Sequence, residues 1–256
     1  MPRFLSPVLI ALWLIASTGQ STALAQESWW SVGLKPGVAL SQLSGDDADH
    51  FNMSNCRADD NIDIRGGTCF VRTGSSIGGF LSLRITPTIA IQPEFYYVQR
   101  GGEYSLYYSP RPPGFPVGEL ITFTRVLDYI EIPLLLRWRQ DIGIFRLAVP
   151  TAHIGPTIAF NLESQDMRRG EGGLYQHDYD LTEYTNSIEY GIAFGGGVDI
   201  LLLGPGAIVL EGRFTLGLSE VGPAYYDRWP KEAVSLEATN IFNRSFSFHI
   251  GYGYPF

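Results

Sequence analysis

The sequence predicts an all-β fold, an eight-stranded antiparallel up-and-down transmembrane β-barrel with four long outer loops and short periplasmic turns. Two observations predict this fold. Large apolar side chains recur at every second position in eight separate runs, as expected for strands with one apolar face. The connections between these runs are alternately long and short, as in a barrel whose two rims face different compartments.

The eight runs share the same alternation of large apolar side chains with small or charged ones. The fifth run changes phase near Pro150 to Pro156, where we expect a bulge or a bend. The runs cover residues 30–41, 76–85, 89–100, 123–138, 145–162, 187–202, 208–218 and 245–256. The long polar connections cover residues 42–73, 101–120, 163–186 and 219–240.

Composition favours many strands and excludes some partners. Of the 256 residues, 17% are charged, 13% are aromatic and 29 are glycine, which suits neither a disordered chain nor a helical bundle. A net charge of −8 gives no basic footprint for nucleic acid. Beyond the N-terminal segment no apolar run approaches the ~18 residues of a membrane-spanning helix.

The N-terminal segment has the three parts of an export signal. Arg3 supplies a positive charge, residues 8–16 form a short apolar core, and Ala23 and Ala25 supply a small-x-small cleavage pattern. We therefore expect residues 1–25 to be a cleaved signal peptide and residues 26–256 to form the barrel domain. The alternative is an N-terminal membrane anchor.

A soluble eight-stranded barrel or sandwich is the alternative fold, with the apolar face pointing inward. Two features favour the membrane. The face opposite the large side chains is rich in Gly, Ala and Ser, which suits a crowded interior better than a solvated surface. Aromatic residues also gather at the strand ends, where an interfacial girdle would need them. They are Trp29, Trp30, Trp138, Tyr252, Tyr254 and Phe256.

The closing run alternates to its last residue. Phe246, Phe248 and Ile250 stand at two-residue spacing, and three aromatic residues continue the pattern. These side chains would form the lipid face of the last strand. That strand must then pair with the first, because an open sheet edge would leave unpaired peptide groups in hydrocarbon.

Several strand motifs resemble one known family. They include "GLKPGV" (residues 33–38), "IQPEFYYVQRGG" (91–102), "YIEIPLLLRW" (129–138) and "GIAFGGGVDI" (191–200). The chain resembles the PorT-like outer-membrane β-barrel proteins, the outer membrane protein β-barrel domain group common in Bacteroidetes. The resemblance implies location in the bacterial outer membrane and a barrel architecture, but no particular activity. Tyr252, Tyr254 and Phe256 also resemble the C-terminal signal that the barrel-assembly machinery reads.

Charged residues recur on the inward face of the runs. We expect them to form a network of ion pairs that fills a narrow barrel, since eight strands leave an interior that side chains alone can fill. In this network Glu131 would pair with a residue such as Arg137 or Arg213. A pore lining or a proton path is the functional alternative. The expected network comprises Lys35, Arg84, Glu94, Glu131, Arg137, Glu189, Asp199, Glu211 and Arg213.

The first long connection contains the two cysteines. In an exported protein Cys56 and Cys69 are expected to form a disulfide within this loop, with two free thiols as the alternative. The acidic run at residues 59–63 lacks the Gly and the Glu of a calcium loop. The four histidines have no metal-binding spacing, so neither a metal nor a cofactor is expected.

These patterns predict a monomeric structural or surface-binding protein that acts through four outer loops and is not an enzyme. Residues 107–118, rich in Pro and aromatics, suit either an adhesive loop tip or a stiffened turn. The expected partners are outer-membrane lipid, lipopolysaccharide, the barrel-assembly machinery during biogenesis and an extracellular ligand. One alternative is a barrel-embedded hydrolase or acyltransferase at the outer rim, with His177 and Asp178 as candidates. Another is a narrow pore for small solutes.

Overall fold

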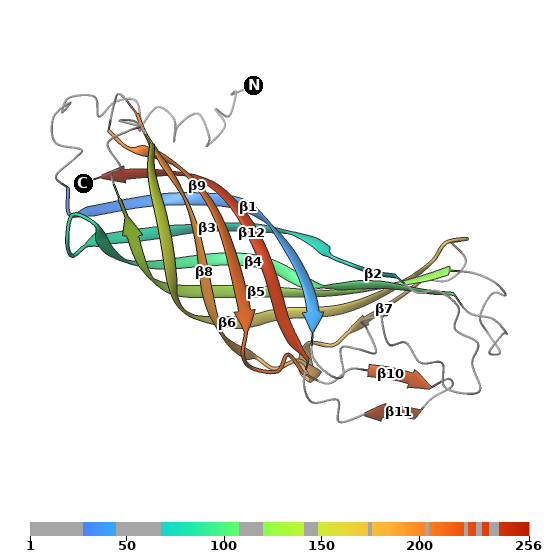
Figure 1. The fold of residues 1–256 in the computed structure, drawn as a ribbon. Coiled ribbons are helices and arrows are strands. Elements are labelled where there is room, and N and C mark those ends of the chain that lie inside the picture. The colour runs from blue at the N-terminus through green and yellow to red at the C-terminus, as the bar shows by residue number, and fades with distance from the viewer. Residues whose placement is uncertain are drawn as a thin grey trace, which may run out of the picture.

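A computed structural model describes residues 28–44, 68–107, 120–140, 148–173, 176–202, 205–222, 225–228, 232–235 and 241–255. Its elements are almost all strands, with one short 3-10 turn (Figure 1). The first six strands are β1 (Trp30–Ser44), β2 (Thr68–Phe70), β3 (Arg72–Arg84), β4 (Ile89–Tyr107), β5 (Leu120–Arg139) and β6 (Ala148–Gly170). The remaining elements are β7 (Gln176–Asp180), η2 (Thr182–Tyr184), β8 (Ile188–Leu201), β9 (Ala207–Gly217), β10 (Tyr225–Arg228), β11 (Glu232–Ser235) and β12 (Phe242–Pro255).

Eight strands form a closed antiparallel ring in the order β1, β3, β4, β5, β6, β8, β9 and β12. The first and last strands of the chain pair from Ser31 opposite Pro255 to Ser44 opposite Phe242, which closes the cylinder (Figure 1). Apart from this closing pair, every neighbour in the ring is also a neighbour along the chain once β2, β7, β10 and β11 are set aside. The predicted eight-stranded up-and-down barrel is confirmed.

The alternation in the sequence separates the two faces of the barrel wall. On β12, Phe248 and Ile250 are 53% and 57% exposed, whereas Ser247 and His249 are buried. Leu34 on β1 is 70% exposed in the same way. A belt of exposed large apolar side chains around all eight ring strands would be unusual on a protein in water and is what a lipid-facing wall requires. Among the described residues, no helix is long and apolar enough to cross a membrane.

The expected phase change near Pro150 to Pro156 is wrong, and the irregularity lies further along β6. Both prolines point outward within an unbroken alternation, because His153 between them is buried at the inward position. The change of phase falls between Asn161 and Ser164, where the pairing of β6 with β5 shifts register. One extra residue in β6 at this point makes a β-bulge.

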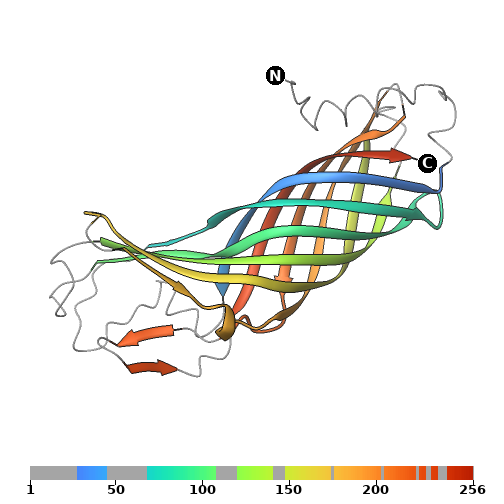
Figure 2. The same ribbon diagram turned by 180° about the vertical axis from the view of Figure 1, so that it is seen from behind.

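Strands β4, β5 and β6 continue well beyond the ring on the side of the long connections (Figures 1 and 2). The projecting sheet consists of residues 101–107, 120–128 and 163–170 of these strands, with β2 paired to β4 and β7 paired to β6. Parts of the connections expected at residues 101–120 and 163–186 are therefore strand. A separate ribbon of β10 and β11 lies in the last long connection.

The stagger of the barrel explains why the sheet projects on one side only. A path that steps from each residue to its partner on the next strand, once around the ring, returns to β1 about ten residues from its starting point. This stagger means that the strands tilt steeply relative to the barrel axis. One row of partners runs from Ser75 through Gln99 and Asp128 to Glu163. These outward side chains are polar, and they mark the level at which β3 to β6 leave the apolar belt.

Candidate functional site

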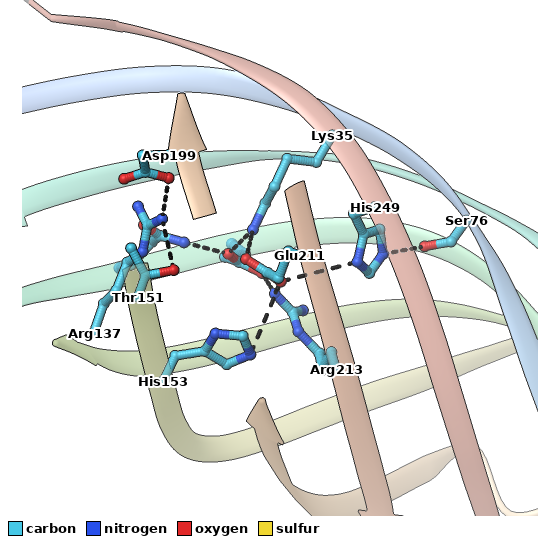
Figure 3. Close-up of polar contacts among 11 residues, drawn as sticks. Lys35, Ser76, Arg137, Thr151, His153, Asp199, Glu211, Arg213 and His249 are labelled. Atoms are coloured by element: carbon cyan, nitrogen blue, oxygen red, sulfur yellow. Dashed lines mark hydrogen bonds and ion pairs between the residues drawn. The ribbon is translucent and has the colours of Figure 1, made fainter. Parts of the chain in front are cut away.

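The centre of the barrel holds a balanced cluster of two cations and two carboxylates (Figure 3). The Nζ of Lys35 donates to Glu94 Oε1 at 2.6 Å and to Glu211 Oε2 at 2.8 Å. The guanidinium of Arg213 donates to both carboxylates. All four side chains are at most 2% exposed, so neutrality within the cluster is what makes their burial tolerable.

These contacts cross the barrel rather than follow its wall. Glu94 is on β4 and Arg213 is on β9, which are four strands apart in a ring of eight and so stand on opposite walls. Asn243 on β12 and Tyr129 on β5 are also four strands apart, and the amide of Asn243 donates to the Tyr129 hydroxyl at 3.2 Å. At these two levels polar side chains meet across the lumen and fill it.

Toward the short turns a second group extends the cluster. Arg137 binds Asp199 at 2.6 Å and reaches Gln92 at 3.3 Å and Thr151 at 3.5 Å. The Gln92 amide in turn donates to Glu94 at 2.6 Å. A continuous chain of hydrogen bonds therefore joins the periplasmic half of the interior to its centre.

Toward the outer rim a third group surrounds Arg100. Its guanidinium binds Glu131, which also accepts from Thr157 at 2.8 Å, and it lies 3.8 Å from Glu189. Glu189 accepts from Asn243 at 2.7 Å. The direct ion-pair partner of Glu131 is thus Arg100, which was not among the two examples expected, and Arg213 acts on Glu131 only as a nearby charge.

Eight of the nine charged side chains expected inside the barrel are buried. The ninth, Arg84, is the last residue of β3 and is half-buried at the rim of the short turns. Sequence reasoning missed Arg100, His153 and His249. Each lies at an inward position of the alternation, so extending the period-two pattern to every polar residue would have found them.

Two glycines make room for the buried histidine rings. Gly37 is paired with Ser76 on one side and with His249 on the other. A Cβ added at Gly37 would lie 2.6 Å from the His249 ring, so the missing side chain lets His249 reach Ser76. Likewise a Cβ at Gly195 would lie 2.8 Å from Nε2 of His153. Along the inner wall, large side chains therefore alternate with glycines.

Ser76, His249 and Glu211 follow the order of a nucleophile, a base and an orienting carboxylate (Figure 3). The Ser76 hydroxyl lies 3.1 Å from His249 Nε2, but His249 Nδ1 is 3.9 Å from Glu211, too far for a hydrogen bond. Glu211 is already held by Lys35 and Arg213. Ser76 and His249 are 4% and 5% exposed, so a substrate has no access to the hydroxyl. The geometry does not support acyl transfer.

The projecting sheet carries an ion pair outside the membrane. Arg169 on β6 binds Asp178 on β7, and the guanidinium holds the pKa of the Asp178 carboxyl below its ordinary value. The hydroxyl and backbone N–H of Thr182 donate to Asp180 and lower its pKa as well. His177 lies beside Tyr179, with ring centroids 6.1 Å apart. These contacts order the strand and assemble no catalytic group.

Several sequence predictions fall outside the described residues. Cys56 is one of them, and the side chain of Cys69 is another, so the disulfide stays a prediction. Phe256 and residues 108–119 are also outside, whereas Tyr252 and Tyr254 lie at the end of β12. Within the described ranges no group of three or more His, Cys, Asp or Glu side chains is placed to hold a metal ion.

Comparison with known proteins agrees with this architecture. Residues 20–221 match the family described as "Outer membrane protein beta-barrel domain", and the chain belongs to that family. It is accordingly a protein of the bacterial outer membrane. No curated protein sequence matches the chain significantly.

Among solved structures, three outer-membrane barrels are similar. OprG from Pseudomonas aeruginosa is 10% identical, with 91% of this chain and 99% of that chain covered and a TM-score of 0.47. Neisserial surface protein A is 11% identical, with 90% and 98% covered and a TM-score of 0.42. Ail from Yersinia pestis is 9% identical, with 88% and 98% covered and a TM-score of 0.36. At these TM-scores the likenesses add nothing to the fold that strand pairing establishes.

Proposed function

We propose that this outer-membrane barrel is a monomeric surface-binding protein with a closed lumen, and that it is neither a conducting pore nor an enzyme. The observation that carries the proposal is the meeting of buried charges from opposite walls, as between Glu94 and Arg213. A filled interior whose charges are paired gives mechanical support to a wall but offers ions no path. Binding is then left to the segments outside the membrane.

The projecting sheet supports the binding half of the proposal. Its strands carry mainly polar outward side chains above the apolar belt, and it stands on the outer side, where a partner has access. A rigid sheet places side chains more reproducibly than a loop does. Of the described residues that face outward, those on this sheet are the ones best placed to meet another molecule.

Conductance tests the closed lumen. The full chain reconstituted in planar bilayers should give no regular single-channel steps, while a general porin in the same bilayers gives them. Regular large steps from the chain would overturn the closed lumen. A fluorophosphonate probe should leave Ser76 unlabelled, because that hydroxyl is buried. Labelling at Ser76 would favour the enzyme instead.

Adhesion tests the binding half. Cells that display the full chain are compared with cells that display a variant in which β6 and β8 are joined by a short turn at residues 162–187. The surfaces are coated with purified extracellular proteins and polysaccharides. Retention on at least one surface by the full chain alone supports the proposal. Retention of neither on any surface contradicts it, and equal retention of both assigns the binding to the outer segments that the variant keeps.

Finer assignments belong to the same proposal. The strand motifs favour a PorT-like member of the family. The lipid-facing belt suits outer-membrane lipid and lipopolysaccharide as the surroundings of the barrel. Tyr252, Tyr254 and Phe256 are proposed as the signal for the barrel-assembly machinery. Replacing all three with serine should lower the yield of assembled barrel in the outer membrane without changing synthesis, and an unchanged yield would remove this role.

A further inference from the structure

Strand β7 forms one edge of the projecting sheet. One side of the strand is paired to β6, and no other strand of the described ranges pairs with its second side. Gln176, His177, Asp178 and Asp180 are exposed. An exposed edge strand presents unpaired peptide groups that can template a further strand.

The hydrogen bonds show which peptide groups face the open side. The N–H of Leu181 donates to the Ser164 carbonyl at 2.8 Å, and the register of β7 places these two residues opposite each other. In an antiparallel pair the residues that bond to the partner alternate with residues that do not. His177, Tyr179 and Leu181 therefore face β6, and the peptide groups of Gln176, Asp178 and Asp180 face away from it.

The edge is held in place before any partner arrives. Leu181 is 6% exposed and fixes the end of the strand. The Arg169–Asp178 ion pair joins the two strands, and the guanidinium of Arg168 lies 4.6 Å from the centre of the Tyr179 ring. A strand that is already ordered loses less conformational entropy when it binds an added strand.

The charge of this region selects the partner. Among the residues that the structure describes around β7, exposed carboxylates outnumber cations, and the nearby Arg169 is already paired with Asp178. A second copy of this chain is disfavoured, because antiparallel pairing of two β7 edges would bring like charges together. The complement is an extended segment rich in lysine or arginine. The exposed carboxylates are Glu163, Glu171, Asp178, Asp180 and Glu183.

We propose that the open edge of β7 binds an extended, cationic peptide segment of a partner protein as an added strand. Main-chain hydrogen bonds to Gln176 and Asp178 would give affinity, and the surrounding carboxylates would give selectivity. The inference rests on the proposed surface-binding function and names the mode of recognition.

The test uses the full chain in lipid nanodiscs and a peptide of about eight residues that alternates lysine with threonine. Binding is followed by fluorescence anisotropy, and contact by amide hydrogen exchange. The peptide should bind and should slow exchange at Gln176 and Asp178. Exchange at Leu181 should stay slow with and without the peptide, which shows that the hairpin is intact. The same peptide with N-methyl groups on alternate residues should bind at least about tenfold more weakly.

Variants separate the edge from its charge. Gln176→Pro removes an outward N–H at the first residue of the strand, where proline is tolerated, and should weaken binding about tenfold. Gln176→Thr keeps the N–H and should bind as the parent does. Glutamate in place of lysine in the peptide should abolish binding.

Equal binding of the N-methylated peptide, no binding of the lysine peptide, or unchanged exchange at Asp178 would overturn the strand-addition mode. The proposal would also be overturned if the partner paired with the β10–β11 ribbon instead of β7, or if the edge of β7 bound a second copy of this chain. If cells still adhere through the segment at residues 162–187 while the edge binds no peptide, this inference fails and the surface-binding function stands.

Discussion

Removing the charge of Glu211 tests whether the central cluster depends on neutrality. Glu211→Gln keeps the size of the side chain and an acceptor oxygen, but it leaves Lys35 and Arg213 to share Glu94 in a site closed to water. Removing one partner of a buried ion pair costs roughly 3–5 kcal/mol. Because the amide still accepts one hydrogen bond, we expect a loss of about 3 kcal/mol in the free energy of unfolding, at the lower end of that range.

A second substitution should restore most of this loss. Lys35→Met together with Glu211→Gln removes one charge of each sign and leaves Arg213 paired with Glu94. The double variant should be less destabilised than the sum of the two single variants by about 2 kcal/mol, within the range for contacting residues. Glu163→Gln, an exposed carboxylate outside the belt, is the matched control and should cost less than about 1 kcal/mol.

Urea unfolding of the refolded barrel in lipid vesicles measures these differences. Tryptophan emission is the signal. Trp30 and Trp138 lie on the lipid-facing side of the wall, where 50% and 44% of their surfaces are not covered by protein. If Glu211→Gln is as harmless as Glu163→Gln, the cluster is not a balanced buried network. Strict additivity of the two single substitutions would refute the same reasoning.

Three further outcomes are expected. Gly37→Ala should cost about 1–3 kcal/mol in the free energy of unfolding, because its Cβ would lie 2.1 Å from a carbonyl oxygen of β12. Gly212→Ala is the control, because the nearest atom to its Cβ would be 3.4 Å away. Equal costs of the two substitutions would contradict this packing. The Asp178 carboxyl should titrate by NMR at a lower pH than in an Arg169→Gln variant. The contribution of that pair to stability is present at neutral pH and lost as pH falls through the lowered pKa, and an unchanged midpoint would refute it. Mass mapping without reduction should link the two cysteines, whereas two alkylatable thiols would exclude the disulfide.

The eight ring strands could be predicted because lipid and the barrel interior make opposite demands on alternate residues. Beyond the apolar belt that contrast disappears. Glu103 and Gln165, for example, lie in strands whose outward face is polar, and the sequence there has the composition of a loop. The projecting sheet was therefore missed. The bulge was expected at Pro150 to Pro156 because proline often marks an irregular strand, although both prolines fit the alternation.

The inward charges could be predicted from the same alternation, but their partners could not. Which residues meet across the lumen depends on the stagger of the ring, which no single strand records. Glu94 and Arg213 are 119 residues apart in the chain and meet only because β4 and β9 stand opposite each other. Glu131 was expected to pair with a residue such as Arg137 or Arg213, and its direct partner is Arg100.

The most direct test of the account asks which face of β5 touches lipid. Leu134 and Leu136 are 51% and 50% exposed on the outer wall, whereas Glu131 is 4% exposed inside the barrel. Single cysteines at these three positions are labelled with a fluorophore in reconstituted vesicles that contain a lipid-phase quencher. Quenching at positions 134 and 136 and none at position 131 is expected. Quenching at position 131 alone, or partition of the chain into buffer without detergent, would contradict a lipid-facing wall around a filled interior.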